Sequence, residues 1–247
     1  HWDLPQALQD EGGWENRNTA YAFADYSALM VKRLGDRVKY WTTFNEPSVV
    51  AFDGNLSGEH APGNQDPRIT YQVAHNLMVA HGLGVQAIRG ANSKVDVGIV
   101  LNLWMADPAT DSPEDIAAAE TAWDRSETLF LDPIFKGHYP LAAYELVGEN
   151  MPKIQDGDMA LISQELDYVG INFYSRNLVS ATQKIDKVPG SEYTEMGWEV
   201  CAPAMRRMLV KVNNNYKLPP VYITENGSAF KDEVSADGKI HDPRRLD

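Results

Sequence analysis

The sequence has little cysteine, little positive charge and no long apolar run, and each shortage excludes a class of protein. Among 247 residues the single cysteine is Cys201, so no disulfide can form within the chain. Its 22 Lys and Arg residues stand against 35 Asp and Glu, a net charge of −13 that repels nucleic-acid phosphates and anionic lipids. No apolar stretch approaches the roughly 18–20 residues that cross a bilayer. We therefore expect neither a nucleic-acid nor a membrane partner.

Recognisable targeting and cofactor motifs are absent as well. The chain begins at His1 with no basic and apolar leader, and we expect a cytoplasmic location, although the natural N-terminus can lie upstream. It contains neither a phosphate-binding loop nor a dinucleotide fingerprint, so no cofactor is expected. The remaining histidines lack the spacing of metal ligands and are interpreted as structural or surface residues: His60, His75, His81, His138 and His241.

The sequence instead alternates between helical and strand patterns. Residues 16–34 carry apolar side chains at three- and four-residue spacing, which predicts an amphipathic helix, and Gly35 follows at the place of a left-handed C-cap. Further helices are predicted over residues 71–89, 113–130 and 203–216, and strands over residues 38–44, 95–101, 166–174 and 220–224. This alternation favours βαβ units with a parallel sheet, and α/β barrels typically need about 250 residues.

Two long stretches without a periodic pattern follow predicted strands. They comprise residues 47–68 and residues 175–200, and the second contains Pro189, Gly190 and Gly197. In a βα barrel such loops build the active face, but a solvated loop is the simpler interpretation of the second stretch.

Two glutamates stand at equivalent places in this scheme. Glu46 (TFNEP) and Glu225 (ITENG) each end a predicted strand, and each has an asparagine beside it in the sequence. A carboxyl pair at the strand ends of one barrel is what glycoside hydrolysis needs, one group donating a proton and the other attacking or activating water. Solvated loop residues and metal ligands are the alternatives for the two glutamates.

Longer motifs carry a resemblance to a known family. In order, the chain contains HWDLPQ, GDRVKYW, TFNEP, GEHAPG, AHNLMVAHG, GIVLNLW, FLDPIFKGHYP, DYVGINFYS, MGWEV, PPVYITENGSAF and DGKIHDPRR. These motifs, and above all TFNEP with ITENG, resemble those of glycoside hydrolase family 1, the β-glucosidase family. The resemblance covers essentially the whole chain.

The resemblance implies a role for particular residues. Glu46 matches the general acid/base and Glu225 the nucleophile of a retaining β-glucosidase. A hydrogen bond from Tyr174 would favour the ionised form of that nucleophile. The matched substrate-binding residues are His1, Trp2, Asn45, Asn172, Tyr174 and Trp198. Without the resemblance, Trp2 and Trp198 could equally be core aromatics.

Departures from the family pattern bear on the substrate. Pro47 stands where 6-phospho-glycosidases usually have isoleucine, which favours unphosphorylated glycosides, such as cellobiose or aryl glucosides. Ser48 stands where many relatives carry tryptophan, so we expect a thinner platform for the leaving group. β-Galactosidase, β-fucosidase and 6-phospho-β-glucosidase activities of the same family stay open.

The resemblance also implies that the chain is an internal segment. Family members form a (β/α)8 TIM barrel, and residues 1–247 match one partial catalytic domain from the end of strand 3 to beyond strand 7. We expect the chain to hold both catalytic carboxyl groups but to lack the first and last strands of the barrel. The alternative is a truncated, non-catalytic chain that only binds sugar or self-associates; the oligomeric state is not predicted.

Overall fold

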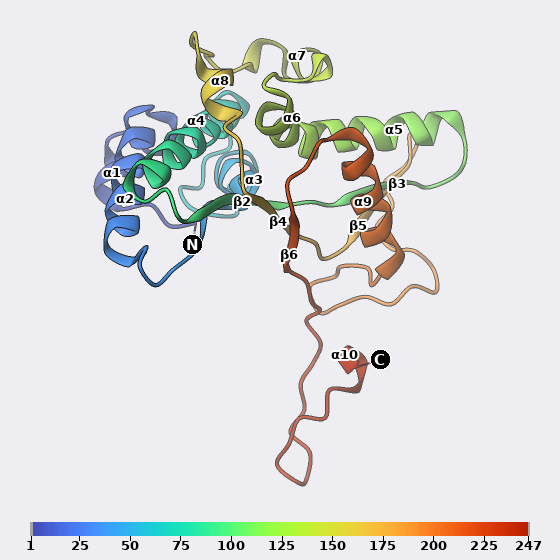
Figure 1. The fold of residues 1–247 in the computed structure, drawn as a ribbon. Coiled ribbons are helices and arrows are strands. Elements are labelled where there is room, and N and C mark those ends of the chain that lie inside the picture. The colour runs from blue at the N-terminus through green and yellow to red at the C-terminus, as the bar shows by residue number, and fades with distance from the viewer. Residues whose placement is uncertain (1, 247) are drawn as a thin grey trace.

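The computed structural model describes residues 2–246, in which helices alternate with parallel strands (Figure 1). The strands are β1 Tyr40–Asn45, β2 Asp96–Asn102, β3 Met105–Pro108, β4 Tyr168–Asn172, β5 Arg176–Val179 and β6 Val221–Glu225. The α-helices are α1 Gln6–Asp10, α2 Asn18–Leu34, α3 Pro47–Phe52, α4 Pro67–Ala91, α5 Pro113–Trp123, α6 Leu129–Lys136, α7 Leu141–Val147, α8 Asp158–Ile162, α9 Ala202–Asn215 and α10 Pro243–Leu246. Short π-helical turns occur at Asp53–Ser57 and Asp124–Thr128, and 3₁₀ turns at Gly13–Glu15 and Gly148–Asn150.

The four predicted strands form one parallel sheet in the order β1-β2-β4-β6. This sheet is strongly curved. Three strand spacings separate β1 from β6, about 14 Å in a flat sheet, yet the rings of Tyr40 and Tyr222 on those two strands lie 6.2 Å apart. Tyr168 on β4 contacts both rings from between them. The predicted α/β class is confirmed, and the curved parallel sheet is part of a (β/α)8 barrel.

Helices cover the outer side of this sheet. α4 has thirteen buried residues, among them Leu77, Met78 and Val85, and packs beside α2 and α8 (Figure 1). Gly82 lies where α4 meets α8, and a Cβ there would sit 2.0 Å from the carbonyl oxygen of Leu161. The apolar face of α4 packs on β1 and β2, and β4 is buried along its whole length, whereas β6 at the edge of the sheet is largely exposed.

Gly35 ends α2 as predicted, but its backbone conformation was predicted wrongly. Its φ is −69°, in the right-handed region. A Cβ at this position would lie 2.6 Å from the carbonyl oxygen of Val31 and 3.0 Å from the side-chain amide of Asn92. Close packing, and not a left-handed turn, explains the glycine.

The two unpatterned stretches contain more structure than predicted. Residues 47–68 include α3 and a π-helical turn, Asp53–Ser57. The stretch after β4 includes β5, which pairs in parallel with β3 in a second, two-stranded sheet. The interpretation of residues 175–200 as a solvated loop is therefore wrong at both ends, where Ser175 and Glu199 are buried.

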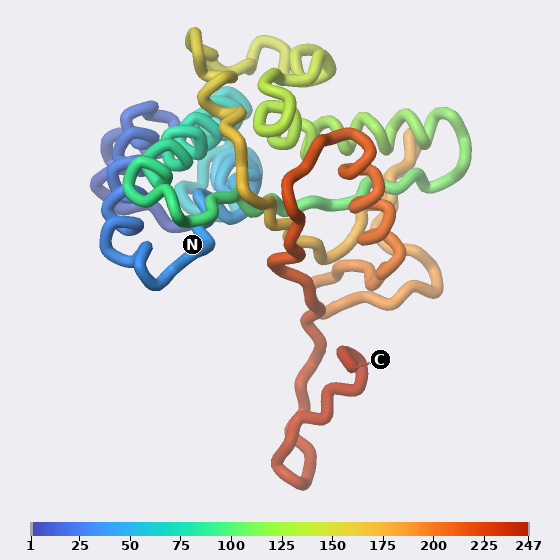
Figure 2. Tube along the Cα trace, viewed as in Figure 1, coloured from blue at the N-terminus to red at the C-terminus, as the bar shows by residue number. Residues whose placement is uncertain are grey.

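The chain after β6 runs away from the sheet and folds back on itself, as the tube in Figure 2 shows. Within this segment Arg245 forms ion pairs with Asp232 and Asp242. No helix between residues 2 and 246 is both long and apolar enough to cross a membrane. The cytoplasmic location stays a prediction.

Candidate active site

The two glutamates lie at the same edge of the curved sheet. Glu225 is the last residue of β6 and pairs in register with Asn172, the last residue of β4, while Glu46 directly follows β1. Because all four strands are parallel, their carboxyl ends meet at one edge. The predicted convergence of Glu46 and Glu225 on one site is therefore found.

Both glutamates line a cavity of about 700 Å³ at this edge. Its wall contains five carboxyl groups and neither lysine nor arginine among the described residues. The lining residues are Trp2, Glu46, Ser48, Val49, Phe52, Asp53, Glu59, His60, Asn102, Trp104, Ser126, Glu127, Tyr174, Met196, Trp198 and Glu225. The cavity thus combines aromatic faces with acidic groups, a surface suited to an uncharged polar ligand.

Glu46 has an unusual backbone conformation directly after the carboxyl end of β1. Its φ of 51° and ψ of 60° lie in the left-handed region, which costs an L-residue about 1–2 kcal/mol. The backbone N–H of Glu46 donates to Val100 on β2 at 2.9 Å, and its carbonyl accepts from Val49 at 3.0 Å. Pro47 then starts α3. Such strain is typical of functional residues, and here it ends the strand with the carboxyl in the cavity wall.

The Glu46 side chain is 5% exposed and has one strong polar partner. The side-chain amide of Asn172 donates to Oε1 of Glu46 at 2.8 Å and to Oδ1 of Asn45 at 3.0 Å. Burial, and secondly the charge of Glu225, raise the pKa of Glu46, against the lowering effect of the Asn172 bond. The environment therefore favours the protonated form of this carboxyl.

Glu225 has a different environment. The hydroxyl of Tyr174 donates to Oε2 of Glu225 at 2.5 Å. Burial and this bond to a carboxylate raise the pKa of Tyr174 well above its ordinary value, so the phenol stays a donor. Glu225 is only partly buried and accepts a hydrogen bond from a phenol, so its environment differs from that of the buried Glu46.

Aromatic side chains surround the carboxyl pair. Trp198 packs against Tyr174 with ring centroids 5.2 Å apart and against the edge of Trp104 at 5.3 Å. Trp2 stacks on His60 at 5.0 Å. Trp2 and Trp198 both line the cavity, so neither is simply a core aromatic.

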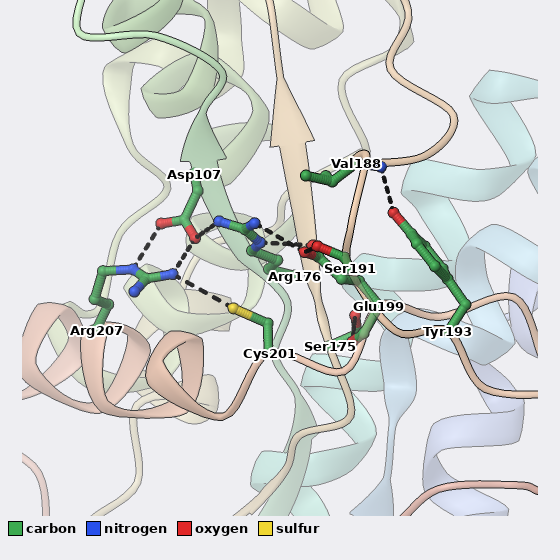
Figure 3. A network of polar contacts seen from close by, with 9 residues as sticks. All are labelled: Asp107, Ser175, Arg176, Val188, Ser191, Tyr193, Glu199, Cys201 and Arg207. Carbon is green, nitrogen blue, oxygen red and sulfur yellow. Dashed lines mark hydrogen bonds and ion pairs between the residues drawn. The ribbon is translucent and has the colours of Figure 1, made fainter.

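An ion-pair network holds the segment that carries Trp198 (Figure 3). Arg176 on β5 binds both carboxylate oxygens of Glu199, at 2.7 and 3.0 Å, and reaches Asp107 on β3 at 3.2 Å. Arg207 on α9 binds Asp107 from the other side. Because Glu199 directly follows Trp198, this network fixes the tryptophan against Tyr174.

The predicted site residues fall into three groups. Tyr174, Trp2 and Trp198 lie on the cavity wall, together with the two glutamates. Asn45 and Asn172 do not line the cavity; Asn172 is fully buried and lies behind Glu46, so its contact is with the carboxyl. His1 falls outside the described residues.

Several lining residues escaped the sequence analysis. His60, interpreted as structural or surface, stacks on Trp2 in the wall. Asn102 ends β2, so the strand-end rule that selected the glutamates could have found it. Nothing in the local sequence marks Glu127, which reaches the cavity from a π-helical turn.

No three acidic, histidine or cysteine side chains between residues 2 and 246 are arranged to hold a metal ion. Among the groups that line or adjoin the cavity, two carboxyl groups stand in unlike environments, one bound by an asparagine and one by a tyrosine, beside an aromatic wall. This arrangement is suited to acid/base and nucleophilic chemistry.

Comparison with known proteins gives consistent relatives. The chain is 43% identical over 253 residues to β-glucosidase A of Thermotoga maritima and 40% identical over 260 residues to a β-glucosidase of Agrobacterium sp.. Both alignments include the whole of this chain but only 57% of the T. maritima protein and 56% of the Agrobacterium protein. The structure matches the T. maritima β-glucosidase in complex with glucoimidazole with a TM-score of 0.95 at 42% identity, over the whole chain and 57% of that protein.

The chain thus spans little more than half the length of these relatives. Virulence factor SghA of Agrobacterium tumefaciens gives a similar result, with a TM-score of 0.93 at 38% identity over the whole chain and 57% of SghA. The model of glycosyl hydrolase family 1 matches residues 1–247. The chain therefore belongs to glycosyl hydrolase family 1.

Proposed function

We propose that this site is the catalytic centre of a retaining β-glycosidase that hydrolyses terminal β-D-glucosides, including cellobiose and aryl glucosides. The observation that carries the proposal is a pair of carboxyl groups in one cavity with unlike environments. Burial favours the protonated form of Glu46, while Tyr174 donates to Glu225. Retaining glycosidases need one acid and one carboxylate of this kind.

In the first step Glu225 attacks the anomeric carbon. The bond from that carbon to the leaving-group oxygen breaks, and Glu46 gives its proton to this oxygen. The sugar is then joined to Glu225 as an ester and the leaving group departs as an alcohol. Asn172 holds the Glu46 carboxyl at 2.8 Å throughout, so the acid is oriented before substrate binds.

In the second step Glu46 acts as a base. Once Glu225 is esterified, it has lost its negative charge, which was one cause of the raised pKa of Glu46. The pKa of Glu46 falls as a result, and its carboxylate takes a proton from water while the water oxygen attacks the anomeric carbon. The β-configured sugar leaves, and both carboxyl groups return to their starting forms.

The names of relatives support the choice of substrate. Two relatives from Thermotoga neapolitana are named 1,4-β-D-glucan glucohydrolases, and SghA has been solved with the substrate analogue salicin. Cellulose-derived oligosaccharides and aryl glucosides are therefore the proposed substrates. The aromatic wall offers Trp198 and Trp104 as stacking faces for sugar or aryl rings.

Two other family activities are weighed differently. A relative from Bifidobacterium breve, 36% identical, is named a bifunctional β-D-glucosidase/β-D-fucosidase, which makes β-fucosidase the second candidate. A 6-phospho-β-glucosidase is disfavoured, because five carboxyl groups and no lysine or arginine line the described cavity.

Azide rescue in the protein at its natural length tests the two roles separately. In Glu225→Gly, azide should restore cleavage of 2,4-dinitrophenyl β-D-glucoside and give the α-glucosyl azide, because azide replaces the nucleophile. In Glu46→Gly, azide should intercept the glycosyl ester and give the β-azide. The product configuration is read by NMR.

Glu165→Gly serves as the control, since Glu165 is exposed and precedes β4 at the opposite edge of the sheet. It should keep wild-type activity. Full activity in either active-site variant without azide, or azides of the reverse configuration, would refute the assignment. A wild-type protein that hydrolyses no β-glycoside would instead support the non-catalytic alternative.

A further inference from the structure

A third carboxyl group in the cavity has no part in double displacement. Glu127 belongs to the π-helical turn Asp124–Thr128, and its side chain is 4% exposed yet contributes to the cavity wall. No ion pair to Glu127 is found among the described residues. Its Oε1 accepts a hydrogen bond from the backbone N–H of Trp104 at 3.3 Å.

Capping this backbone N–H engages one oxygen of Glu127 and leaves the rest of the carboxyl group for a second partner. Burial raises the pKa of Glu127 to about 8, so near neutral pH the side chain is mainly a carboxylic acid. Unlike a carboxylate, it then has a proton to donate.

A complementary acceptor lies on the same wall. Oδ1 of Asn102 is buried and accepts no hydrogen bond from residues 2–246. A buried carbonyl oxygen without a donor is costly, and a hydroxyl group from a ligand would supply that donor. Asn102 ends β2, the neighbour of the strand that precedes Glu46. The acceptor therefore lies at the same edge of the sheet as Glu46 and lines the same cavity.

We propose that Glu127 and Asn102 form a hydrogen-bonding subsite that selects hydroxyl-bearing, uncharged leaving groups such as a second sugar. A hydroxyl there donates to Oδ1 of Asn102 and accepts from the Glu127 carboxylic acid. The proposal rests on the proposed β-glycosidase function and adds a specificity-determining residue to it. No covalent step involves Glu127.

The test compares leaving groups on one glycone in the protein at its natural length. kcat/KM is measured for cellobiose, whose leaving group is a sugar, and for p-nitrophenyl β-D-glucoside, whose leaving group has no hydroxyl of its own. In Glu127→Leu the cellobiose value should fall about tenfold, a loss expected when a site loses one hydrogen bond to a substrate hydroxyl. The aryl value should change less than about twofold.

Glu127→Gln should keep the ratio of the two values near that of the wild type, because an amide is neutral and both donates and accepts. The ratio in the wild type should decline more steeply as the pH rises past about 8, where Glu127 ionises, than it does in Glu127→Gln. The titration of Glu46 weakens cleavage of cellobiose more than that of the aryl glucoside, whose leaving group needs less protonation, so Glu127→Gln, which keeps Glu46, supplies the reference profile. Glu145→Leu, on the exposed face of α7, is the matched control and should leave the ratio unchanged.

Each outcome decides the matter. Equal losses for both substrates in Glu127→Leu would reduce Glu127 to a cap for Trp104 and overturn the proposal. A wild-type ratio with the same pH dependence as that of Glu127→Gln would overturn it too. If the wild-type protein hydrolyses neither substrate, the proposed function itself fails, which is a distinguishable result.

Discussion

Replacing Asn172 should shift the alkaline limb of the pH–activity profile to higher pH while lowering the activity itself. The Asn172 amide is fully buried and makes three hydrogen bonds, to Glu46, to Asn45 and from the hydroxyl of Thr224 at 2.6 Å. Its bond to Glu46 is the one contribution that lowers the pKa of that carboxyl. Asn172→Leu keeps the branching at Cγ and keeps water out, but removes all three bonds.

The sign follows from the role of Glu46 as the acid. Without the amide the pKa of Glu46 rises further, so the group stays protonated to higher pH. Because kcat/KM falls as the acid loses its proton, the alkaline limb of the profile should shift to higher pH. The rate at the optimum should nevertheless drop by about 100-fold, since a carboxyl that is no longer oriented is a poor donor.

Stability should fall in parallel. Three buried hydrogen bonds at about 1 kcal/mol each predict a loss of about 3 kcal/mol in the free energy of unfolding, measured by urea denaturation. Thr224→Val is the matched control, because it removes one bond to Asn172 and leaves the bond to Glu46. It should cost about 1 kcal/mol and leave the alkaline limb in place.

The decisive measurement is kcat/KM for p-nitrophenyl β-D-glucoside against pH in the wild type and both variants. An alkaline limb that stays put or moves to lower pH in Asn172→Leu would refute the reasoning, whatever the size of the rate loss. So would a shift of the same size in Thr224→Val.

Three further predictions concern the rest of the site. Tyr174→Phe should lower kcat/KM by about 10- to 100-fold, because a hydrogen bond to a charged group contributes about 1.5–3 kcal/mol, and an unchanged value would deny that Tyr174 assists Glu225. The bond from Arg176 lowers the pKa of Glu199. The stabilisation that this bond gives the folded protein is therefore complete above about pH 4.3 and disappears as the pH falls through the lowered pKa. The free energy of unfolding of Glu199→Gln, measured by urea denaturation, should therefore differ from that of the wild type at pH 7 and converge with it in acid. Prolonged EDTA treatment should leave kcat within about twofold, and a loss restored by a divalent ion would favour the alternative in which the glutamates bind metal.

Much of the site could be predicted because local pattern and chain direction suffice for it. The alternation of helical and strand patterns in the sequence located β1, β2, β4 and β6 to within a few residues. Parallel strands bring their carboxyl ends to one edge of the sheet. Residues at those ends therefore converge whatever the details of packing. Glu46 and Glu225 were candidates in this way, and the resemblance of TFNEP and ITENG to family 1 motifs selected them; Asn102 was available by the same strand-end rule.

Conformations that depend on neighbours could not be predicted. The left-handed backbone of Glu46 is imposed by its bond to Val100 and by the start of α3, and a glutamate has no preference for it. At Gly35 the turn preference of glycine suggested a positive φ. The glycine is needed instead because a Cβ would be too close to Val31 and Asn92. In both cases a residue far along the chain, Val100 for Glu46 and Asn92 for Gly35, contributes to the local geometry.

Sequence alone determined the α/β class and the parallel direction of the strands, which follow from short-range periodicity and connectivity, and the family motifs selected the two glutamates at the strand ends. Only the tertiary structure decided which carboxyl is buried against Asn172 and which is bound by Tyr174, and that Glu127 enters the same cavity. Burial and hydrogen-bond partners come from segments far apart in the chain, and they determine whether a carboxyl group acts as an acid, a nucleophile or a neutral donor.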